Sequence, residues 1–219
     1  MTGYPRVVPL GDSALLAILG EGVGVALSAR VGRLAGALRD LAAPGVHGVV
    51  PAYAAVAIHF DPLAADSEAL GRQVAHLAAA EMAKPAPDAT AGGKLHVLPV
   101  RYDGPDLAMV ADRLRLAPDE VARRHAQLTY RVLFLGFVPG FGYLGPLDSA
   151  LALPRRPEPR RRVPAGSVAI AGEQTAVYPV ETPGGWHLIG HTETVLFDSS
   201  REPPNLLAAG DRVRFEPVS

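Results

Sequence analysis

The stretch Leu135-Gly-Phe-Val-Pro-Gly-Phe-Gly-Tyr-Leu-Gly145 is the most informative part of this chain for its fold. Three segments of the same character follow it: Val163-Pro-Ala-Gly-Ser-Val168, Ala171-Gly-Glu-Gln-Thr175 and Pro183-Gly-Gly-Trp-His-Leu-Ile-Gly190. Glycine reaches positive φ angles and lets another backbone or a ligand approach closely. Turns of this kind that also carry aromatic side chains favour a cleft lined by loops.

Short apolar segments surround these turns in the second half of the chain. Strands are predicted over residues 94–101, 130–138, 167–171, 175–179, 186–190, 194–198 and 212–217. Helices are predicted over residues 106–114 and 118–127, the second with Pro118 at its favoured first position. Many short strands with frequent turns are typical of a closed β-barrel. Residues 94–219 are therefore predicted to form a barrel domain.

The first half of the chain has a different pattern. Strands are predicted over residues 7–10, 14–19, 46–50 and 54–60. Apolar residues recur at helical spacing from Val31 to Leu41 and again over residues 66–83. Residues 1–83 are therefore predicted to form a small α/β sandwich, so that the whole chain is an α+β protein. Residues 84–93, with two prolines and a terminal glycine pair, are predicted to be the linker between the domains.

The composition argues against several classes of function. The chain has 219 residues, and 48% of them are hydrophobic, which is enough for a core. Because 21 Lys and Arg residues nearly balance 22 Asp and Glu residues, neither nucleic acid nor an anionic membrane is an expected partner. Without cysteine there is no disulfide, thiol nucleophile or Cys-ligated zinc. No stretch approaches the roughly 20 apolar residues of a membrane helix, and the N-terminus lacks a signal-like apolar segment, which predicts a cytoplasmic protein.

In their order and spacing, the four glycine-rich segments resemble the family of the B-type 5-oxoprolinase subunits, also called KipI-like or allophanate hydrolase subunit 1 proteins. Upstream segments that resemble the same family are Gly11-Asp-Ser-Ala-Leu-Leu16, Val50-Pro-Ala-Tyr53, His59-Phe-Asp-Pro62 and His125-Ala-Gln-Leu-Thr-Tyr-Arg-Val132. The resemblance covers nearly the whole chain. It implies a cyclophilin-like β-barrel for residues 94–219 and a relation to subdomains C and D of carboxyltransferase domains.

The resemblance implies one principal function and two alternatives. The principal function is the B-type subunit of an ATP-dependent 5-oxoprolinase, which opens the lactam of 5-oxoproline to give glutamate. Its implied partners are a homologous C-type subunit and an A-type subunit, and its implied co-substrate is ATP with Mg²⁺. The alternatives are an inhibitor of a sporulation-type histidine kinase and a carboxyltransferase or allophanate hydrolase component of urea metabolism. Because the sequence has no phosphate-binding loop, dinucleotide fingerprint or nucleophile elbow, any use of ATP is expected to involve the partner subunits.

Three residues are candidates for catalysis. His125 lies at the end of a predicted helix, where a histidine either caps the helix or serves as a general acid or base. Tyr143 carries a hydroxyl that needs a partner, and Gln174 offers both a donor and an acceptor, which suits the amide edge of a lactam. No metal site is predicted. His187 and His191 share a face of a predicted strand, but no third ligand of suitable spacing accompanies them.

The candidate substrate-binding residues lie in the turns themselves. Pro139-Gly140 predicts a tight turn that brings aromatic rings together, either as the wall of a site or as a plug of the barrel. Pro164-Ala-Gly-Ser167 can aim backbone N–H groups and a hydroxyl at one point, as an oxyanion pocket requires. Trp186 either contacts a ligand or anchors the barrel core. The full set is Phe137, Pro139, Gly140, Phe141, Pro164, Ala165, Gly166, Ser167, Gly172, Glu173, Gly185 and Trp186.

Further features concern charge and loop length. Five arginines, Arg155, Arg156, Arg160, Arg161 and Arg162, form either a solvated loop or an edge that docks a partner subunit. The family commonly has arginine where this chain has His191, which weakens an anion-binding role carried over to that position. The stretch over residues 100–106 is also shorter than its counterpart in the family, so a loop that contacts substrate or a partner is expected to be trimmed here.

Overall fold

A computed structural model of the chain describes residues 3–85 and 92–218. The chain divides into two compact units, Met1–Ala91 and Gly92–Ser219. Most of the predicted linker, residues 86–91, lies outside the described residues. Among the described helices, none is both long and apolar enough to cross a membrane.

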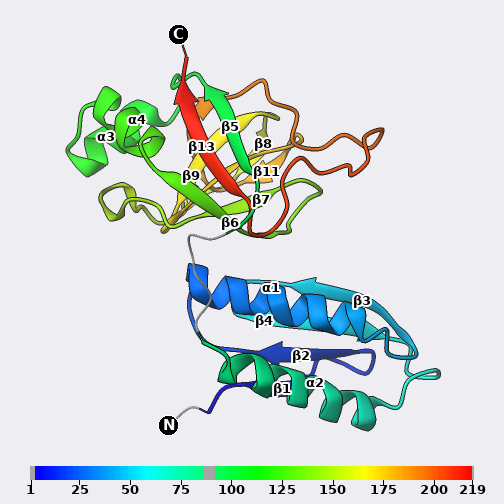
Figure 1. The fold of residues 1–219 in the computed structure, drawn as a ribbon. Helices are drawn as coiled ribbons and strands as arrows, with labels where there is room; N and C mark the ends of the chain where they lie inside the picture. The colour runs from blue at the N-terminus through cyan, green and yellow to red at the C-terminus, as the bar shows by residue number, and fades with distance from the viewer. Residues whose placement is uncertain (1–2, 86–91, 219) are drawn as a thin grey trace. The chain divides into compact units, whose positions relative to one another are not determined.

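The first unit is an antiparallel sheet with two helices on one face (Figure 1). Its strands are β1 (Arg6–Pro9), β2 (Ala14–Ile18), β3 (Val46–Pro51) and β4 (Ala55–Phe60), in the order β1-β2-β4-β3. The helices α1 (Val25–Asp40) and α2 (Ser67–Ala83) pack against each other and bury apolar residues at helical spacing, Val31, Leu34, Ala35 and Leu38 in α1 and Leu70, Val74 and Ala78 in α2. Alternate residues of β2 and β4 complete this core.

The second unit is built on a seven-stranded sheet with the order β12-β9-β10-β7-β6-β13-β5. These strands are β5 (Leu95–Val100), β6 (Thr129–Leu135), β7 (Gly142–Gly145), β9 (Ser167–Ala171), β10 (Gln174–Val177), β12 (His187–His191) and β13 (Arg212–Pro217). All the pairs in the sheet are antiparallel except β5 with β13. Outside it lie α3 (Leu107–Leu114), α4 (Pro118–Ala126), a 3₁₀ turn η1 (Ser149–Leu151) and a separate two-stranded sheet of β8 (Arg160–Val163) and β11 (Thr182–Gly184).

The two edges of this sheet meet. Arg101, directly after β5, exchanges two backbone hydrogen bonds with His191 at the end of β12. The Arg101 N–H donates to the His191 carbonyl over 2.9 Å, and the His191 N–H donates to the Arg101 carbonyl over 2.8 Å. Because β5 and β12 are the outermost strands of the order, these bonds make the sheet a nearly closed barrel.

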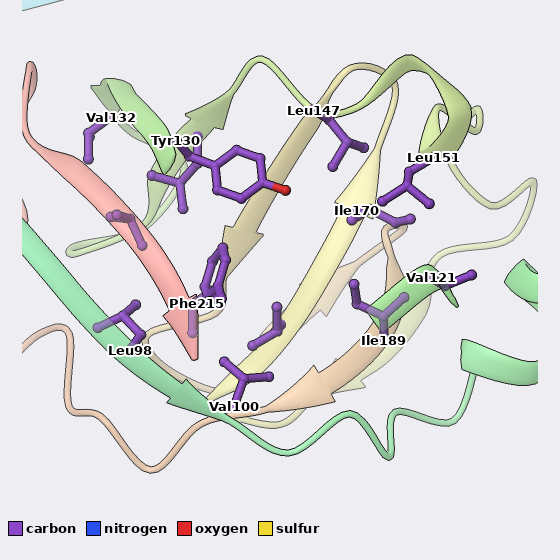
Figure 2. Close-up of a cluster of buried hydrophobic side chains, with 14 of the residues drawn as sticks. Leu98, Val100, Val121, Tyr130, Val132, Leu147, Leu151, Ile170, Ile189 and Phe215 are labelled. Carbon is purple, nitrogen blue, oxygen red and sulfur yellow. The ribbon is translucent and has the colours of Figure 1, made fainter. Parts of the chain in front are cut away.

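Large side chains fill the interior of the barrel. Tyr130, Phe215, Ile170 and Ile189 are at most 1% exposed and belong to one buried cluster. Figure 2 shows Tyr130 and Phe215 beside each other between the strands, with Ile170 and Ile189 on the far side. The helices α3 and α4 lie beside the barrel (Figure 1) and contribute Val121, among others, to the same cluster.

Most predicted elements are present, with boundaries displaced by a few residues. The helix predicted from Val31 begins earlier, at Val25. The sequence does not predict β7, β8 or β11. The strand predicted over residues 194–198 is wrong: this segment makes a single bridge, between Phe197 and Asn205, because only the short stretch 204–206 pairs with it.

Candidate functional site

Aromatic side chains from the glycine-rich segments gather on the outer face of the barrel. Phe141, Tyr178 and Trp186 are 1%, 1% and 5% exposed. With their neighbours they form what we call the aromatic cluster: Phe141, Val163, Ala169, Ala171, Ala176, Tyr178, Trp186 and Leu188, with Val138 and Tyr143 packed against it. The segments predicted to line a cleft are therefore largely brought together, but as a second buried core rather than as an open cavity.

The alternation of β9 explains why two cores form. Ile170 points into the barrel, whereas Ala169 points outward into the aromatic cluster. Small side chains on the outer face leave room for rings. The two-stranded β8–β11 sheet lies close to these rings, since a Cβ added to Gly184 would be only 2.2 Å from the Tyr178 hydroxyl oxygen.

Phe141 is at the centre of the cluster. Its ring centroid lies 5.0 Å from that of Tyr143, 5.3 Å from that of Tyr178 and 5.8 Å from that of Trp186, and all three pairs meet edge to face. This is a favourable arrangement for aromatic quadrupoles. Phe141 therefore fixes the positions of the other rings.

Tyr143 lies at the accessible margin of the cluster. Its ring stacks on Phe134 with centroids 4.3 Å apart and an interplanar angle of 8°. Burial raises the pKa of Tyr143 above its usual range, and the charge of Arg155 partly offsets this rise. Arg155 itself lies over Trp186, with its guanidinium carbon 6.0 Å from the ring centroid. A protonated hydroxyl beside a guanidinium can donate a hydrogen bond to a carbonyl oxygen that gains negative charge.

The predicted turn at Pro139-Gly140 is present. The Phe141 N–H donates to the Val138 carbonyl over 3.1 Å. Gly140 has φ +80°, and a Cβ there would lie 2.7 Å from the Phe197 Cβ, so this turn requires glycine. Next to the turn, Phe137 combines a φ of +72° with 60% exposure of its side chain.

The turn Pro164-Ala-Gly-Ser167 joins β8 to β9. Its Gly166 N–H donates to the Tyr178 carbonyl over 2.7 Å, and its Ser167 N–H donates to the Pro164 carbonyl over 3.3 Å. Ser167 is only 5% exposed. These two N–H groups thus serve the local fold, whereas Pro164 and Ala165 are exposed.

Gly172 and Glu173 form the turn between β9 and β10 and are exposed. They lie at the opposite end of β9 from Ser167, which in an extended strand is about 16 Å away. The two turns that the sequence offers as one binding region therefore do not converge. Gln174, the first residue of β10, is 8% exposed and lies opposite Ala171.

His125 lies inside the barrel and is completely buried. Its Nδ1 is 2.7 Å from the Tyr102 hydroxyl, and its Nε2 is 2.7 Å from the Thr175 Oγ1. Because the Thr175 hydroxyl donates to the Ala169 carbonyl over 3.0 Å, it accepts from His125, which assigns the proton to Nε2 and makes Tyr102 the donor to Nδ1. Burial lowers the pKa of His125 from 6.5 to about 3, so the ring is neutral. These contacts place His125 at the base of β10, away from solvent.

The arginine-rich segment is tied to the barrel by Asp106. This carboxylate, 4% exposed, accepts hydrogen bonds from Arg156 over 3.1 Å, from Arg160 over 2.7 Å and from the Leu188 N–H over 2.8 Å. Burial would raise the pKa of Asp106, but the hydrogen bonds from Arg160 and Leu188 lower it overall. Arg162, on β8, pairs with Glu181, which directly precedes β11.

His187 and His191, which the sequence places on one face of a strand, have different partners. The His187 Nε2 donates to the Pro154 carbonyl over 2.8 Å, whereas the His191 Nε2 lies 3.2 Å from a Glu193 carboxylate oxygen. No group of three His, Asp or Glu side chains within residues 3–85 and 92–218 is placed to hold a metal ion.

Sequence reasoning missed Asp106, Tyr102 and Thr175. Asp106 is the first residue of a predicted helix, where an acidic residue is expected for capping alone. Its arginine partners lie about 50 residues away, so no local pattern reveals the contact. Tyr178, by contrast, stands in a glycine-rich region and belongs to the same aromatic pattern as Phe141.

Comparison with known proteins assigns the chain to a family. The family described as carboxyltransferase domain, subdomain C and D, matches residues 5–207. The B-type 5-oxoprolinase subunit of Bacillus subtilis (strain 168) is 37% identical over 100% of this chain and 95% of its own length. The protein of the same name from Escherichia coli O157:H7 is 42% identical over 97% of this chain and 95% of its own length.

Solved structures agree with this assignment. TTHA0988 matches with a TM-score of 0.81 and 41% identity over 94% of this chain, which spans only 40% of that protein. PH0987 from Pyrococcus horikoshii matches with a TM-score of 0.57 and 38% identity over 98% of both chains. The Kluyveromyces lactis urea amidolyase, at 20% identity and a TM-score of 0.78, shares the fold. The chain belongs to the family of carboxyltransferase domains, subdomains C and D.

Proposed function

We propose that this chain is the B-type subunit of a multi-subunit, ATP-dependent 5-oxoprolinase, which opens the lactam of 5-oxoproline to give glutamate. The observation that carries the proposal is the match to two proteins named as B-type 5-oxoprolinase subunits, over at least 97% of this chain and 95% of each of theirs. A match of this extent includes every element of both units. The likeness to urea amidolyase, at 20% identity, supports the fold alone.

Within this function, the margin of the aromatic cluster is the proposed reaction site. Tyr143 is proposed to donate a hydrogen bond to the lactam carbonyl oxygen, where negative charge develops when the amide is attacked. Phe137, which is 60% exposed, offers the apolar surface beside it, and the buried rings of Phe141 and Trp186 hold Tyr143 in place. Positioning an amide against such donors lowers the barrier without a covalent intermediate on this chain.

Gln174 and His125 are proposed to act together. His125 donates to Thr175, the neighbour of Gln174 on β10, and so holds the start of that strand in place. In this proposal His125 is a positioning residue because it is completely buried, while Gln174 meets the amide edge of the substrate.

The partners and the co-substrate belong to the assembled complex. We propose that homologous C-type and A-type subunits complete the site and that ATP, with Mg²⁺, activates the lactam there. In the described residues no group of three His, Asp or Glu side chains is placed to hold a metal ion, and we assign no step of ATP chemistry to this chain. The units Met1–Ala91 and Gly92–Ser219 are proposed to be two domains, the second a cyclophilin-like barrel.

Reconstitution tests the proposal directly. The purified chain is mixed with its A-type and C-type partners, and 5-oxoproline-dependent ATP hydrolysis and glutamate release are measured with each component omitted in turn. We expect activity only in the complete mixture. Absence of activity, when the partners are folded and associated, would overturn the proposal and bring histidine-kinase binding and the urea-related activities forward as the next assays.

A further inference from the structure

A pocket of about 270 Å³ opens where the two edges of the barrel meet. Its lining residues are Pro99, Arg101, His191, Thr192, Glu193, Thr194 and Val218. None of the predicted catalytic or substrate-binding residues is among them. Pockets for drug-sized ligands typically measure roughly 300–1,000 Å³, so this one suits a smaller molecule than a nucleotide.

An arginine and a histidine line this pocket, and each lies against a carboxylate of the chain. The Arg101 Nε donates to Asp103, and the His191 Nε2 lies 3.2 Å from Glu193. Both carboxylates are solvent-accessible, with Asp103 50% and Glu193 86% exposed. Exposed pairs of this kind contribute little free energy, so a ligand carboxylate can replace them. Since each of the two bases lies against an acid of the chain, the pocket has no surplus positive charge for a polyanion such as ATP.

The remaining lining is partly polar and partly apolar. The Thr192 hydroxyl donates to the Thr194 Oγ1 and accepts from the Thr194 N–H, each over 3.2 Å. The hydroxyl hydrogen of Thr194 is then left to donate to a ligand oxygen. Pro99 and Val218 supply apolar walls, and Val218 is held by donating its N–H to the Val100 carbonyl over 2.9 Å. The lining thus suits a small acid with a compact apolar body and a second polar group.

The turn Pro164-Ala-Gly-Ser167 supports the histidine of this pocket. A Cβ added to Gly166 would lie 2.5 Å from the His191 Cε1, so the imidazole rests directly on the turn. The Thr192 N–H also donates to the Gly166 carbonyl over 2.9 Å. The turn therefore fixes His191 and Thr192 before a ligand arrives, which reduces the entropy lost on binding.

Building on the proposed function, we propose that this pocket is a carboxylate-binding subsite that captures 5-oxoproline. Arg101 and His191 bind its carboxylate, Thr194 donates to a second ligand oxygen, and the ring methylenes lie against Pro99 and Val218. When the substrate is absent, the Glu193 carboxylate lies against His191, and it competes with the substrate carboxylate for this side chain. No lining residue of the pocket belongs to the aromatic cluster, so the subsite is a capture position that contributes to substrate affinity, and the chemical step follows once the substrate has moved to the cluster.

Calorimetric titration of the full-length chain tests this proposal without any turnover. The probes are 5-oxoproline, 2-pyrrolidinone, which lacks the carboxylate, and glutamate, the open product. We expect 2-pyrrolidinone to bind at least about tenfold more weakly than 5-oxoproline, because charge-assisted hydrogen bonds are lost. Arg101→Gln, which keeps the backbone bonds that close the barrel, is expected to weaken 5-oxoproline binding about tenfold. Glutamate binding as tight as that of 5-oxoproline would contradict capture of the closed ring.

Two further variants sharpen the test. Glu193→Gln removes the internal competitor and is expected to tighten 5-oxoproline binding about two- to fivefold. Arg72→Gln makes the same chemical change as Arg101→Gln at an exposed arginine of the first unit and is expected to leave binding unchanged. Opposite effects of Arg101→Gln and Glu193→Gln distinguish a cationic subsite from general loss of structure, which would weaken binding in both variants.

The reconstituted complex separates this proposal from the proposed function. There, Arg101→Gln is expected to raise the KM for 5-oxoproline about tenfold and leave kcat within twofold. A complex that turns over with an unchanged KM in this variant would overturn the subsite and leave the proposed function standing. A chain that binds 5-oxoproline with the expected variant effects, in a complex that never hydrolyses it, would support the subsite and overturn the oxoprolinase function.

Discussion

The Nε2 of His125 lies 2.7 Å from the Oγ1 of Thr175, inside the barrel and completely screened from water. The Thr175 hydroxyl donates its own hydrogen bond to the Ala169 carbonyl oxygen of β9, so this series of hydrogen bonds ends on the backbone. On the Thr175 side, these bonds therefore give a proton on His125 no route to a substrate. The contact joins α4 to the centre of the sheet and couples the position of β10 to the ionisation of one buried ring.

This burial makes the stability of the protein depend on pH. The pKa of His125 is lowered by burial from 6.5 to about 3, so between these values the unfolded chain binds a proton that the folded chain does not. The free energy of unfolding therefore falls as the pH is lowered through this window, by at most about 1.4 kcal/mol per pH unit. Urea denaturation at pH 7, 6 and 5 measures the slope. We expect His125→Gln to abolish most of it, whereas His47→Gln, at an exposed histidine, should retain it; equal slopes in all three proteins would refute the assignment.

Substituting two glycines of the predicted binding turns distinguishes the cost of backbone strain from the cost of steric crowding. Gly166 and Gly172 both have positive φ, +79° and +57°. A Cβ at Gly166 would lie 2.3 Å from the Thr192 carbonyl oxygen, whereas a Cβ at Gly172 meets nothing within 4 Å. We expect Gly172→Ala to lower the free energy of unfolding by about 1–2 kcal/mol, from the left-handed conformation alone. Gly166→Ala adds overpacking and is expected to lower it by about 2–5 kcal/mol.

Urea denaturation of the two glycine variants gives this comparison. A Gly166→Ala protein as stable as Gly172→Ala would mean that the turn can move away from Thr192, and the support that it gives to His191 would then be weak. The imidazole resonances of His191 in an NMR spectrum provide a second reading, because only Gly166→Ala should displace that ring.

The ion pairs of Asp106 with Arg156 and Arg160 are expected to stabilise the arginine-rich segment. Asp106→Asn keeps the volume of the side chain but leaves Arg156 and Arg160 beside a neutral amide. Breaking a buried ion pair is strongly destabilising, and because the arginines are 30% and 23% exposed we expect the low end of that range, about 3 kcal/mol. Asp112→Asn, at an exposed position of α3, serves as the control and should leave the urea midpoint unchanged. Similar midpoints for the two variants would show that the segment is held by other contacts.

The sequence predicts the elements whose pattern is local. α2 follows the apolar spacing of residues 66–83 to within one residue, and β9 follows its predicted range without change. The sequence does not predict β7, because the segment Gly142-Tyr-Leu-Gly145 has little intrinsic β-propensity. There the glycines lie close to neighbours from distant segments: a Cβ on Gly142 would lie 3.2 Å from the Leu207 Cδ1, so that side chain would have to shift. The reverse error at residues 194–198 has the same origin, since apolar residues of high propensity form no strand without a partner.

In the candidate site, too, the sequence predicts local features but not contacts between distant segments. The glycine-rich segments indicate that Phe141, Tyr143 and Trp186 lie together, because the turn-forming residues and the aromatic residues are neighbours in the sequence. The burial of His125 depends on Phe215, which stacks on it from a strand 90 residues further along, with ring centroids 4.6 Å apart. The pocket between Arg101 and His191 likewise exists only because the barrel closes there, and no spacing in the sequence specifies that closure.

Tyr143→Phe tests the aromatic cluster as a reaction site. The substitution keeps the ring that stacks on Phe134 and removes only the hydroxyl, so the free energy of unfolding should change by less than about 1 kcal/mol. If the hydroxyl donates to the lactam oxygen in the transition state, kcat of the reconstituted complex is expected to fall about 100-fold with little change in KM. Tyr178→Phe is the matched control, because its hydroxyl lies in the same cluster but is buried, with its ring 1% exposed. That variant is expected to be less stable and to retain its kcat once folded. Should Tyr143→Phe keep full activity, Tyr143 would be a wall of the cluster only, and the donor to the lactam would have to come from one of the partners.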